Sequence, residues 1–251
     1  MNIQLNGPKI LWTLHTNTFL GDLHITQTLV MSWIVMAIVT GLCIWLGHGL
    51  RVENVSRRQA VAEMLVTKLE GFVHDNMGPD FDRYIPLVGA LFACSVFSNL
   101  ISLLGFWSPT ADLSTEAGWA IVVFVLITYH KIRASGIGQY LLGYLKPIFI
   151  MAPINVISEF ATPVSMACRH FGNILSGMVI STLIYASLAG LSGLLFGWLP
   201  GAAGQVLGAI PFFDVGIPAF LSLYFDWFSG CIQAFIFCTL TTIYIRQAAE
   251  G

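Results

Sequence analysis

Two long stretches without any formal charge constrain this chain most. Residues 23–50 and 84–111 contain no Asp, Glu, Lys or Arg. Their apolar centres, 29–46 and 86–107, are long enough as helices to cross a hydrocarbon layer about 30 Å thick. Charged residues form only 10% of the 251 residues, against roughly 25% in soluble domains, which is too few to cover a water-soluble globule. The sequence therefore predicts an integral membrane protein.

Three further segments complete the predicted spans. The stretch 117–130 lies between Glu116 and Lys131, and it is short for a span unless basic side chains at its end reach back to the interface. A long helix is predicted over 153–189 with Pro163 inside it; at 1.5 Å per residue it measures about 55 Å, so it must be strongly tilted. The segment 218–247 then returns across the membrane. Glycine and proline predict the turn before it, at Gly190, Gly193, Gly197, Pro200, Gly201, Gly204, Gly208 and Pro211.

The chain is thus predicted to be one all-α integral membrane domain of about five membrane helices plus an amphipathic surface helix, whose last two spans form a long tilted antiparallel hairpin. Mixed charge and helically spaced apolar residues place the surface helix in 51–83. The expected order is an external segment 1–26, a first span 27–48, a cytoplasmic segment 49–83, the second and third spans 84–133, a cytoplasmic or interfacial connection 134–152 and the hairpin 153–251.

Basic residues lie almost entirely on one side of these spans. Lys9 is alone on the other side. Because cytoplasmic loops carry an excess of Lys and Arg, we expect the N-terminus outside and the C-terminus in the cytoplasm. The residues on the cytoplasmic side are Arg51, Arg57, Arg58, Lys68, Arg83, Lys131, Arg133, Lys146 and Arg246.

The one remaining basic residue, Arg169, lies in the middle of the predicted long helix. A guanidinium stays protonated and costs at least about 2.5 kcal/mol at the centre of a membrane helix, so it needs an acidic, polar or aqueous partner. We interpret Arg169 as a functional residue. The alternative is a permanent ion pair within the chain, with Asp226 of the last span as its acid.

Polar residues form stripes at helical spacing. The stripe on the long helix consists of Ser158, Thr162, Ser165, Arg169, Asn173 and Ser176. The stripe on the last helix consists of Ser222, Asp226, Ser229 and Gln233, and Asp226 supplies an acid that can exchange a proton. A weaker stripe on the second span, Ser95, Asn99 and Ser102, is compatible with helix packing and with a water path alike.

Other classes of function find no support in the sequence. A net charge of -2 offers no basic face for nucleic acid. The five cysteines lack the spacing of metal or redox sites, so we interpret them as small packing residues and expect neither metal nor cofactor. The phosphate-loop, serine-hydrolase and zinc-peptidase motifs are absent from the sequence, so we expect no catalytic activity in the chain itself.

Several runs in order resemble subunit a of the F-type ATP synthases, the bacterial membrane stator subunit. They are I-T-Q-T-L-V-M-S-W-I-V-M at 25–36, F-S-N-L-I-S-L-L-G and P-T-A-D within 97–112, P-I-N-V-I-S-E-F-A-T-P at 153–163, R-H-F-G-N at 169–173 and I-Q-A-F-I-F at 232–237. The similarity covers nearly the whole chain. It implies a place in the F1Fo complex of a bacterial plasma (inner) membrane, in contact with lipid, the ring of c subunits and the b-subunit peripheral stalk.

The resemblance also implies roles for particular residues. Arg169 would face the ring carboxylates and block leak, with Gln233 as its partner on the last helix. Two offset half-channels would carry the ion, H⁺ or Na⁺. Glu159 would lie toward the cytoplasmic half-channel, and the outer one would include Asp226, Asn99 and Ser102. Further residues of the proposed path are Asn173, Ser229, Ser165 and Ser176.

Two positions depart from the family's usual pattern. His170 stands where the common run has Leu; it lies about 100° around the helix from Arg169, and we favour a packing role for it over proton handling. Met178 stands where many relatives carry Glu or His, which leaves Asp226 as the acid of the outer path.

Two other functions compete with this interpretation. A proton-coupled secondary transporter would use an Asp226–Arg169 pair as its gate and would transport as an isolated chain; the inverted repeats typical of such proteins are not visible in the sequence. A purely structural scaffold would leave Arg169 and the polar stripes without a reason.

Overall fold

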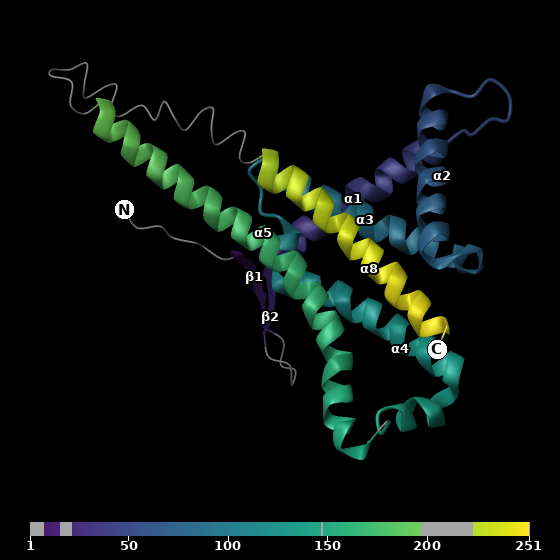
Figure 1. Cartoon of the computed structure of the whole chain (residues 1–251). Helices are drawn as coiled ribbons and strands as arrows, with labels where there is room; N and C mark the ends of the chain where they lie inside the picture. Colours follow the sequence, from purple (N-terminus) through teal and green to yellow (C-terminus); the bar gives the residue numbers. More distant parts are fainter. Residues whose placement is uncertain (1–7, 16–21, 147, 197–222, 251) are drawn as a thin grey trace.

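The computed structural model describes residues 8–15, 22–146, 148–196 and 223–250. Over these residues the protein is a bundle of long helices with a small β-ribbon (Figure 1). In chain order its elements are β1 (Ile10–Leu14), β2 (Leu23–Thr26), α1 (Gln27–Gly47), α2 (Arg57–Met77), the 3-10 helix η1 (Pro79–Tyr84), α3 (Ile85–Leu103), the 3-10 turn η2 (Pro109–Ala111), α4 (Leu113–Gly143), the 3-10 turn η3 (Phe149–Met151), α5 (Ala152–Phe196), the π-helical turn η4 (Leu223–Ser229) and α8 (Gly230–Glu250).

Five segments of the described chain are long and apolar enough to cross a membrane, which confirms the predicted all-α membrane fold. They are Gln27–Gly47, Pro79–Leu103, Leu113–Gly143, Phe149–Leu188 and Trp227–Glu250. The third is not short, because α4 continues past Lys131 to Gly143. Its backbone changes direction at Gly136, where a positive φ of 77° favours glycine.

The β-ribbon is an addition to the predicted fold. Strands β1 and β2 pair antiparallel, and the chain passes directly from β2 into α1. Thr26 ends the strand and caps the helix, because its hydroxyl accepts a hydrogen bond from the backbone N–H of Leu29 at 3.4 Å. The ribbon therefore anchors the start of the first span.

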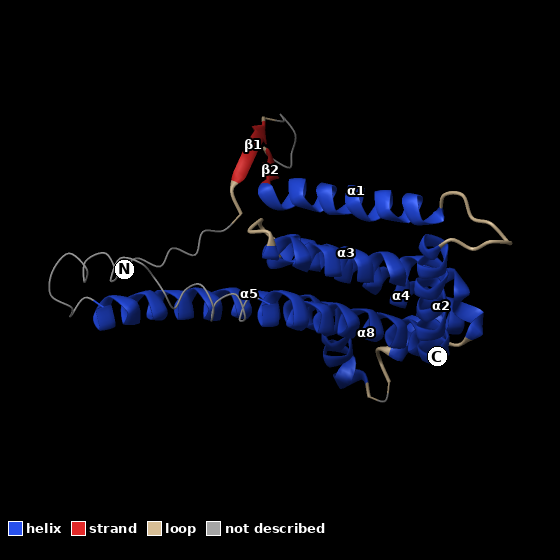
Figure 2. Cartoon of the chain, turned by 90° about the horizontal axis from the view of Figure 1, so that it is seen from above, coloured by secondary structure: helices blue, strands red, loops and turns tan. Residues whose placement is uncertain are grey.

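The helices pack in layers around α3. Figure 2 shows α1, α3 and α5 in successive layers, with α1 on the outer side of α3. A small cluster of Val35, Val39 and Ile101 joins α1 to α3. The main core joins α2, α3, α4, α5 and α8 and includes Val73, Val88, Val123, Met166, Phe237 and Ile245. This core holds the middle of α5 against α4 and α8.

Helix α5 extends far beyond that core. Among the described residues its buried positions are confined to the stretch between Met166 and Gly177, and the later part projects past the other helices (Figures 1 and 2). Pro163 lies inside the helix, and the early part of α5 is bent (Figure 1), as expected where proline removes a backbone hydrogen bond. The predicted turn at Gly190 and Gly193 is wrong, because both are helical; the rest of that turn lies outside the described residues.

Of two surface features, helix α2 agrees with the predicted surface helix and the cysteines differ in part from expectation. Helix α2 packs Leu69 and Phe72 against the core but leaves Val61, Met64 and Leu65 about half exposed, so its apolar face is only partly covered by the chain. The cysteines do not all serve packing. Cys238 is buried, whereas Cys43 and Cys168 are exposed, because both lie on helix faces that no other described element covers.

Candidate functional site

Arg169 lies on the outer face of α5, in its middle. Its side chain is exposed, whereas Met166, Ala167 and His170, on the side of the helix that packs against the bundle, are buried. Among the described residues no acid pairs with Arg169 and no hydrogen bond to it is found. The side chain of Asp226 lies outside the described part of the structure. The intramembrane arginine is therefore presented to the surroundings of the chain.

The polar stripe on α5 shares this outer face. Ser158, Ser165 and Ser176 are exposed, and Thr162 and Asn173 are half-buried. The hydroxyl of Ser176 donates to the carbonyl of Gly172, one turn back along the helix. Such bonds satisfy hydroxyl groups at little cost in a membrane helix, so the stripe can border lipid, water or another protein.

A hydrogen bond joins the two helices of the hairpin one turn beyond Arg169. The side-chain amide of Asn173 donates to the hydroxyl of Ser229 at 2.8 Å. Ser229 belongs to the π-helical turn η4, so the α-helical spacing that predicted one stripe on the last helix does not hold there. Ser222 lies outside the described residues. Gln233 follows in α8 and is 6% exposed, so it faces the bundle.

Asn99 and its neighbours on α3 form a sealed network. Asn99 is 3% exposed, and its side-chain oxygen accepts a hydrogen bond from the hydroxyl of Thr110 at 2.8 Å. Gly230 at the start of α8 lies so close that an added Cβ would be 2.7 Å from the amide nitrogen of Asn99. The hydroxyl of Ser102 donates to the carbonyl of Asn99 at 2.6 Å. These contacts favour the packing interpretation of this stripe over a water path.

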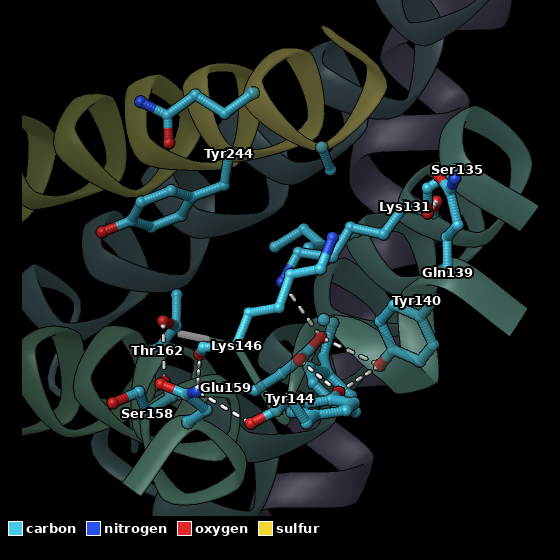
Figure 3. A pocket seen from close by; sticks show the side chains of 16 residues that line it. Lys131, Ser135, Gln139, Tyr140, Tyr144, Lys146, Ser158, Glu159, Thr162 and Tyr244 are labelled. Carbon is cyan, nitrogen blue, oxygen red and sulfur yellow. Dashed lines mark hydrogen bonds and ion pairs between the residues drawn. The ribbon is translucent and has the colours of Figure 1, made fainter. Parts of the chain in front are cut away.

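A cavity of about 740 Å³ opens between α4, α5 and α8, at the end of the bundle that holds the C-terminus (Figure 1). Its walls include Lys131, Tyr140, Tyr144, Ser158, Glu159 and Thr162. Figure 3 shows Lys131, Tyr140 and Tyr144 gathered around the carboxylate of Glu159. The lower end of the α5 stripe, Ser158 and Thr162, thus borders this cavity.

Glu159 is bound by three donors in the cavity wall. Lys131 Nζ donates to Glu159 Oε1 at 3.0 Å, the hydroxyl of Tyr140 donates to the same oxygen at 3.1 Å, and the hydroxyl of Tyr144 donates to Oε2. The Glu159 side chain is 8% exposed and that of Lys131 is 39% exposed. Partial burial, followed by the hydrogen bond to Glu159, raises the pKa of Tyr144, so this phenol remains a donor.

Sequence reasoning missed the three partners of Glu159. The sequence places Lys131 at the end of a predicted span, and it places Tyr140 and Tyr144 in the predicted connection 134–152. The available signal was the spacing of four residues between the two tyrosines, which puts them on one face of a helix. Their distance from Glu159 along the chain hid the contact.

A second acid, Glu116, lies in the core behind Arg169. Its Oε2 is 2.8 Å from His170 Nδ1, and both side chains have 0% exposure. The approach does not have hydrogen-bond angles, and neither the carboxylate oxygens nor Nδ1 have another partner among the described residues. Ser95 Oγ lies 3.3 Å from His170 Nε2. His170 is therefore more than an apolar packing residue, and Glu116, which the sequence suggested only as the boundary of a span, is its partner.

The fold and this site together define an integral membrane protein that exposes a charged side chain from the middle of a membrane helix. Ion translocation is common in this class of protein. Comparison with known proteins makes the class specific. The family described as ATP synthase A chain matches residues 29–246, and the chain belongs to this family. It is accordingly a non-catalytic, ion-translocating membrane subunit of an ATP synthase.

Individual relatives cover nearly the whole chain. "ATP synthase subunit a 1" of Prosthecochloris aestuarii is 32% identical over 236 residues, which cover 92% of this chain and 93% of the relative. "ATP synthase subunit a 1" of Chlorobium luteolum is 30% identical and covers 99% of both chains. "ATP synthase subunit a, sodium ion specific" of Propionigenium modestum is 32% identical and covers 96% of this chain and 85% of the relative.

Proposed function

We propose that the chain provides two offset half-channels to carboxylates carried on a ring of c subunits, and that Arg169 discharges each carboxylate as it passes. One observation carries the proposal: Arg169 is exposed on α5 and has no partner among the described residues. A charge in a membrane helix is expensive, so an unpaired one indicates a partner outside the chain.

The surface around Arg169 supports contact with a neighbouring helix. Val164 and Leu183 on α5 are 60% and 49% exposed, and small polar residues lie between them, including Ser165 and Ser176. Small residues allow membrane helices to approach closely. The outer face of α5 therefore suits a moving ring that must present one acid after another to Arg169.

Electrostatics explains how such an arrangement moves an ion. A ring carboxylate in contact with lipid is stable only when neutral, because a bare charge there costs several kcal/mol. Opposite the guanidinium of Arg169 the ionised form is favoured, so the ion leaves. The permanent positive charge also keeps ions from passing directly between the half-channels. A membrane potential supplies about 2.3 kcal/mol per elementary charge per 100 mV to this cycle.

The cavity around Glu159 is the proposed cytoplasmic half-channel. It lies at the end of the bundle with Lys131 and Lys146, which the excess of basic residues assigns to the cytoplasm. Glu159 precedes Arg169 by ten residues of helix, about 15 Å along the axis. The serine and threonine of the stripe, Ser158 and Thr162, lie at the start of that interval.

The proposed outer half-channel starts from the other end of the hairpin. Asp226 is its exchangeable acid, because with Met178 at its position α5 carries no acid after Arg169, and Ser229, Asn173 and Gln233 continue toward Arg169. Asn99 and Ser102 support the packing of α3 against α8 behind it. Either H⁺ or Na⁺ is compatible with these oxygen and amide groups, and a relative's name specifies sodium. The b-subunit stalk, the F1 sector and a bacterial plasma membrane complete the proposed setting.

Replacing Arg169 tests this function directly. Arg169→Ala is expected to abolish ATP-driven pumping in inverted membrane vesicles while ATP hydrolysis by the soluble sector persists. Dye quenching measures H⁺ uptake and radioactive sodium measures Na⁺ uptake. Arg246→Ala is the matched control, because Arg246 lies near the end of α8 and, within the described chain, bonds to Glu250 and to the backbone carbonyl of Asn76. Full pumping by Arg169→Ala would refute the assignment, and transport by the isolated chain in liposomes would support a secondary transporter instead.

A further inference from the structure

The inner face of α5 carries a polar contact at the residue after Arg169, about 100° around the helix from it. Among the described residues the buried positions of α5 are Met166, Ala167, His170 and Gly177, and His170 is the polar one. Its imidazole meets Glu116 of α4 at 2.8 Å and Ser95 of α3 at 3.3 Å. Three helices therefore converge on one side chain, and that side chain follows Arg169 in the sequence.

Aromatic rings keep the imidazole in place. The ring centroid of Trp119 from α4 lies 6.4 Å from that of His170, and the ring centroid of Phe237 from α8 lies at 5.8 Å. With 0% exposure of His170 and Glu116, there is no room for water between them. A charged or proton-sharing contact in such a dry site is strong and depends sharply on distance.

This contact can set the rotation of α5 about its own axis. Apolar contacts are non-directional, and the described apolar side chains of α5 that are buried are Met166 and Ala167, so these contacts alone would leave the helix free to turn slightly. Side chains end about 5–6 Å from a helix axis, so a turn of about 30° would displace the end of Arg169 by about 3 Å. That displacement is as large as a hydrogen bond is long, so the arginine would miss its target.

We propose that Glu116 and His170 are positioning residues that fix the rotation of α5, so that Arg169 points out of the bundle at the carboxylates it discharges. The inference rests on the proposed role of Arg169 but concerns residues that do not touch the ion path. It also explains why two ionisable groups are retained in a sealed core, where a pair of apolar residues would pack without desolvation cost.

Two double variants of the complete ATP synthase in native membranes separate positioning from packing. Glu116→Leu/His170→Leu removes the contact but leaves an apolar core, and Glu116→His/His170→Glu restores it with the partners exchanged. Glu250→Gln is the control for loss of an acid, because Glu250 is an exposed residue at the end of α8. Each variant is assayed for the amount of assembled complex and for ions pumped per ATP hydrolysed.

A disulfide reports the rotation of α5 independently of pumping. Asn173 and Ser229 are in hydrogen-bond contact between α5 and η4, so Asn173→Cys with Ser229→Cys forms a cross-link in the otherwise unchanged chain, identified by peptide mass spectrometry. When α5 turns, the yield should fall, because a disulfide requires Cβ atoms about 3.5–4.5 Å apart and tolerates little displacement of either one.

In the leucine double variant we expect an assembled complex and a disulfide yield near background. We also expect about tenfold fewer ions pumped per ATP hydrolysed, because a small misplacement of a reacting group slows its reaction by that much or more. The exchanged pair should recover both quantities. Unchanged disulfide yield and pumping in the leucine variant would overturn the proposal. If that variant does not assemble, Glu116→Gln takes its place with the same two criteria. Pumping by Arg169→Ala would refute only the proposed role of Arg169. The positioning proposal would stand, because the disulfide yield does not depend on pumping.

Discussion

Two glutamates contact α5 in opposite environments. Glu159 belongs to α5 itself and borders a cavity of about 740 Å³, where Lys131, Tyr140 and Tyr144 bind both of its oxygens. Glu116 reaches α5 from α4, has 0% exposure and meets His170 alone. The first acid is well bound and close to water. The second is sealed and has a single ionisable neighbour, His170.

This difference separates groups that can exchange ions from groups that hold the helices in place. An acid exchanges protons or cations only when a path to water exists, and the cavity supplies one for Glu159. Glu116 has no such path, so its charge can act only on its neighbours. Arg169 lies between the two environments: its helix is anchored from inside and its side chain is presented outside. Mutations at the two acids should therefore affect different measurements.

The largest effect is expected from His170→Leu. It leaves Glu116 buried without a partner, and removal of one partner of a buried pair costs about 3–5 kcal/mol. We expect little assembled complex and a clearly lowered thermal transition of the purified complex. Adding Glu116→Leu should restore assembly, because no unpaired group then remains. Normal stability of His170→Leu alone would show that the buried carboxyl group of Glu116 needs no partner, contrary to this expectation.

A smaller effect, on transport instead of stability, is expected from Glu159→Gln. The glutamine side chain lacks the negative charge that holds Lys131 and both tyrosines. Hydrogen bonds to a charged group contribute about 1.5–3 kcal/mol each, so passive ion flux through the membrane sector should fall about tenfold or more. Stability should change little, because Lys131 is 39% exposed and reaches water. Flux is measured in vesicles stripped of the soluble sector, with Glu250→Gln as control. Unchanged flux would move the cytoplasmic path away from this cavity.

The smallest effect is expected from Tyr144→Phe, which removes one donor from Glu159. A single hydrogen bond contributes about 0.5–1.5 kcal/mol, so flux should fall a few-fold. An ordinary tyrosine begins to ionise near pH 10. The phenol of Tyr144 stays protonated at that pH, because its pKa is raised. The difference between wild type and Tyr144→Phe should therefore persist from neutral to alkaline pH. Tyr129→Phe, at an exposed tyrosine, is the control; a difference that vanishes toward pH 10 would contradict the raised pKa.

Local features of the sequence were sufficient for the spans and for Arg169. Hydropathy is a property of each segment, so the five membrane-competent helices and the long α5 followed from composition and spacing. Arg169 stood out because a lone charge in an apolar helix is conspicuous without any knowledge of its neighbours. The failures were also local in origin: glycines at 190 and 193 predicted a turn that the helix does not make, and α-helical spacing was assumed where η4 is π-helical.

A set of membrane helices and the polar residues that they carry could be predicted from the sequence alone. The contact of His170 with Glu116, the enclosure of Glu159 by Lys131 and two tyrosines, and the bond of Asn173 to Ser229 became visible only in the folded chain. The two sets of features differ in the range of the interactions behind them. Burial in lipid depends on one segment at a time, whereas an ion pair depends on the rotation and register of two helices, which the packing of the entire bundle sets.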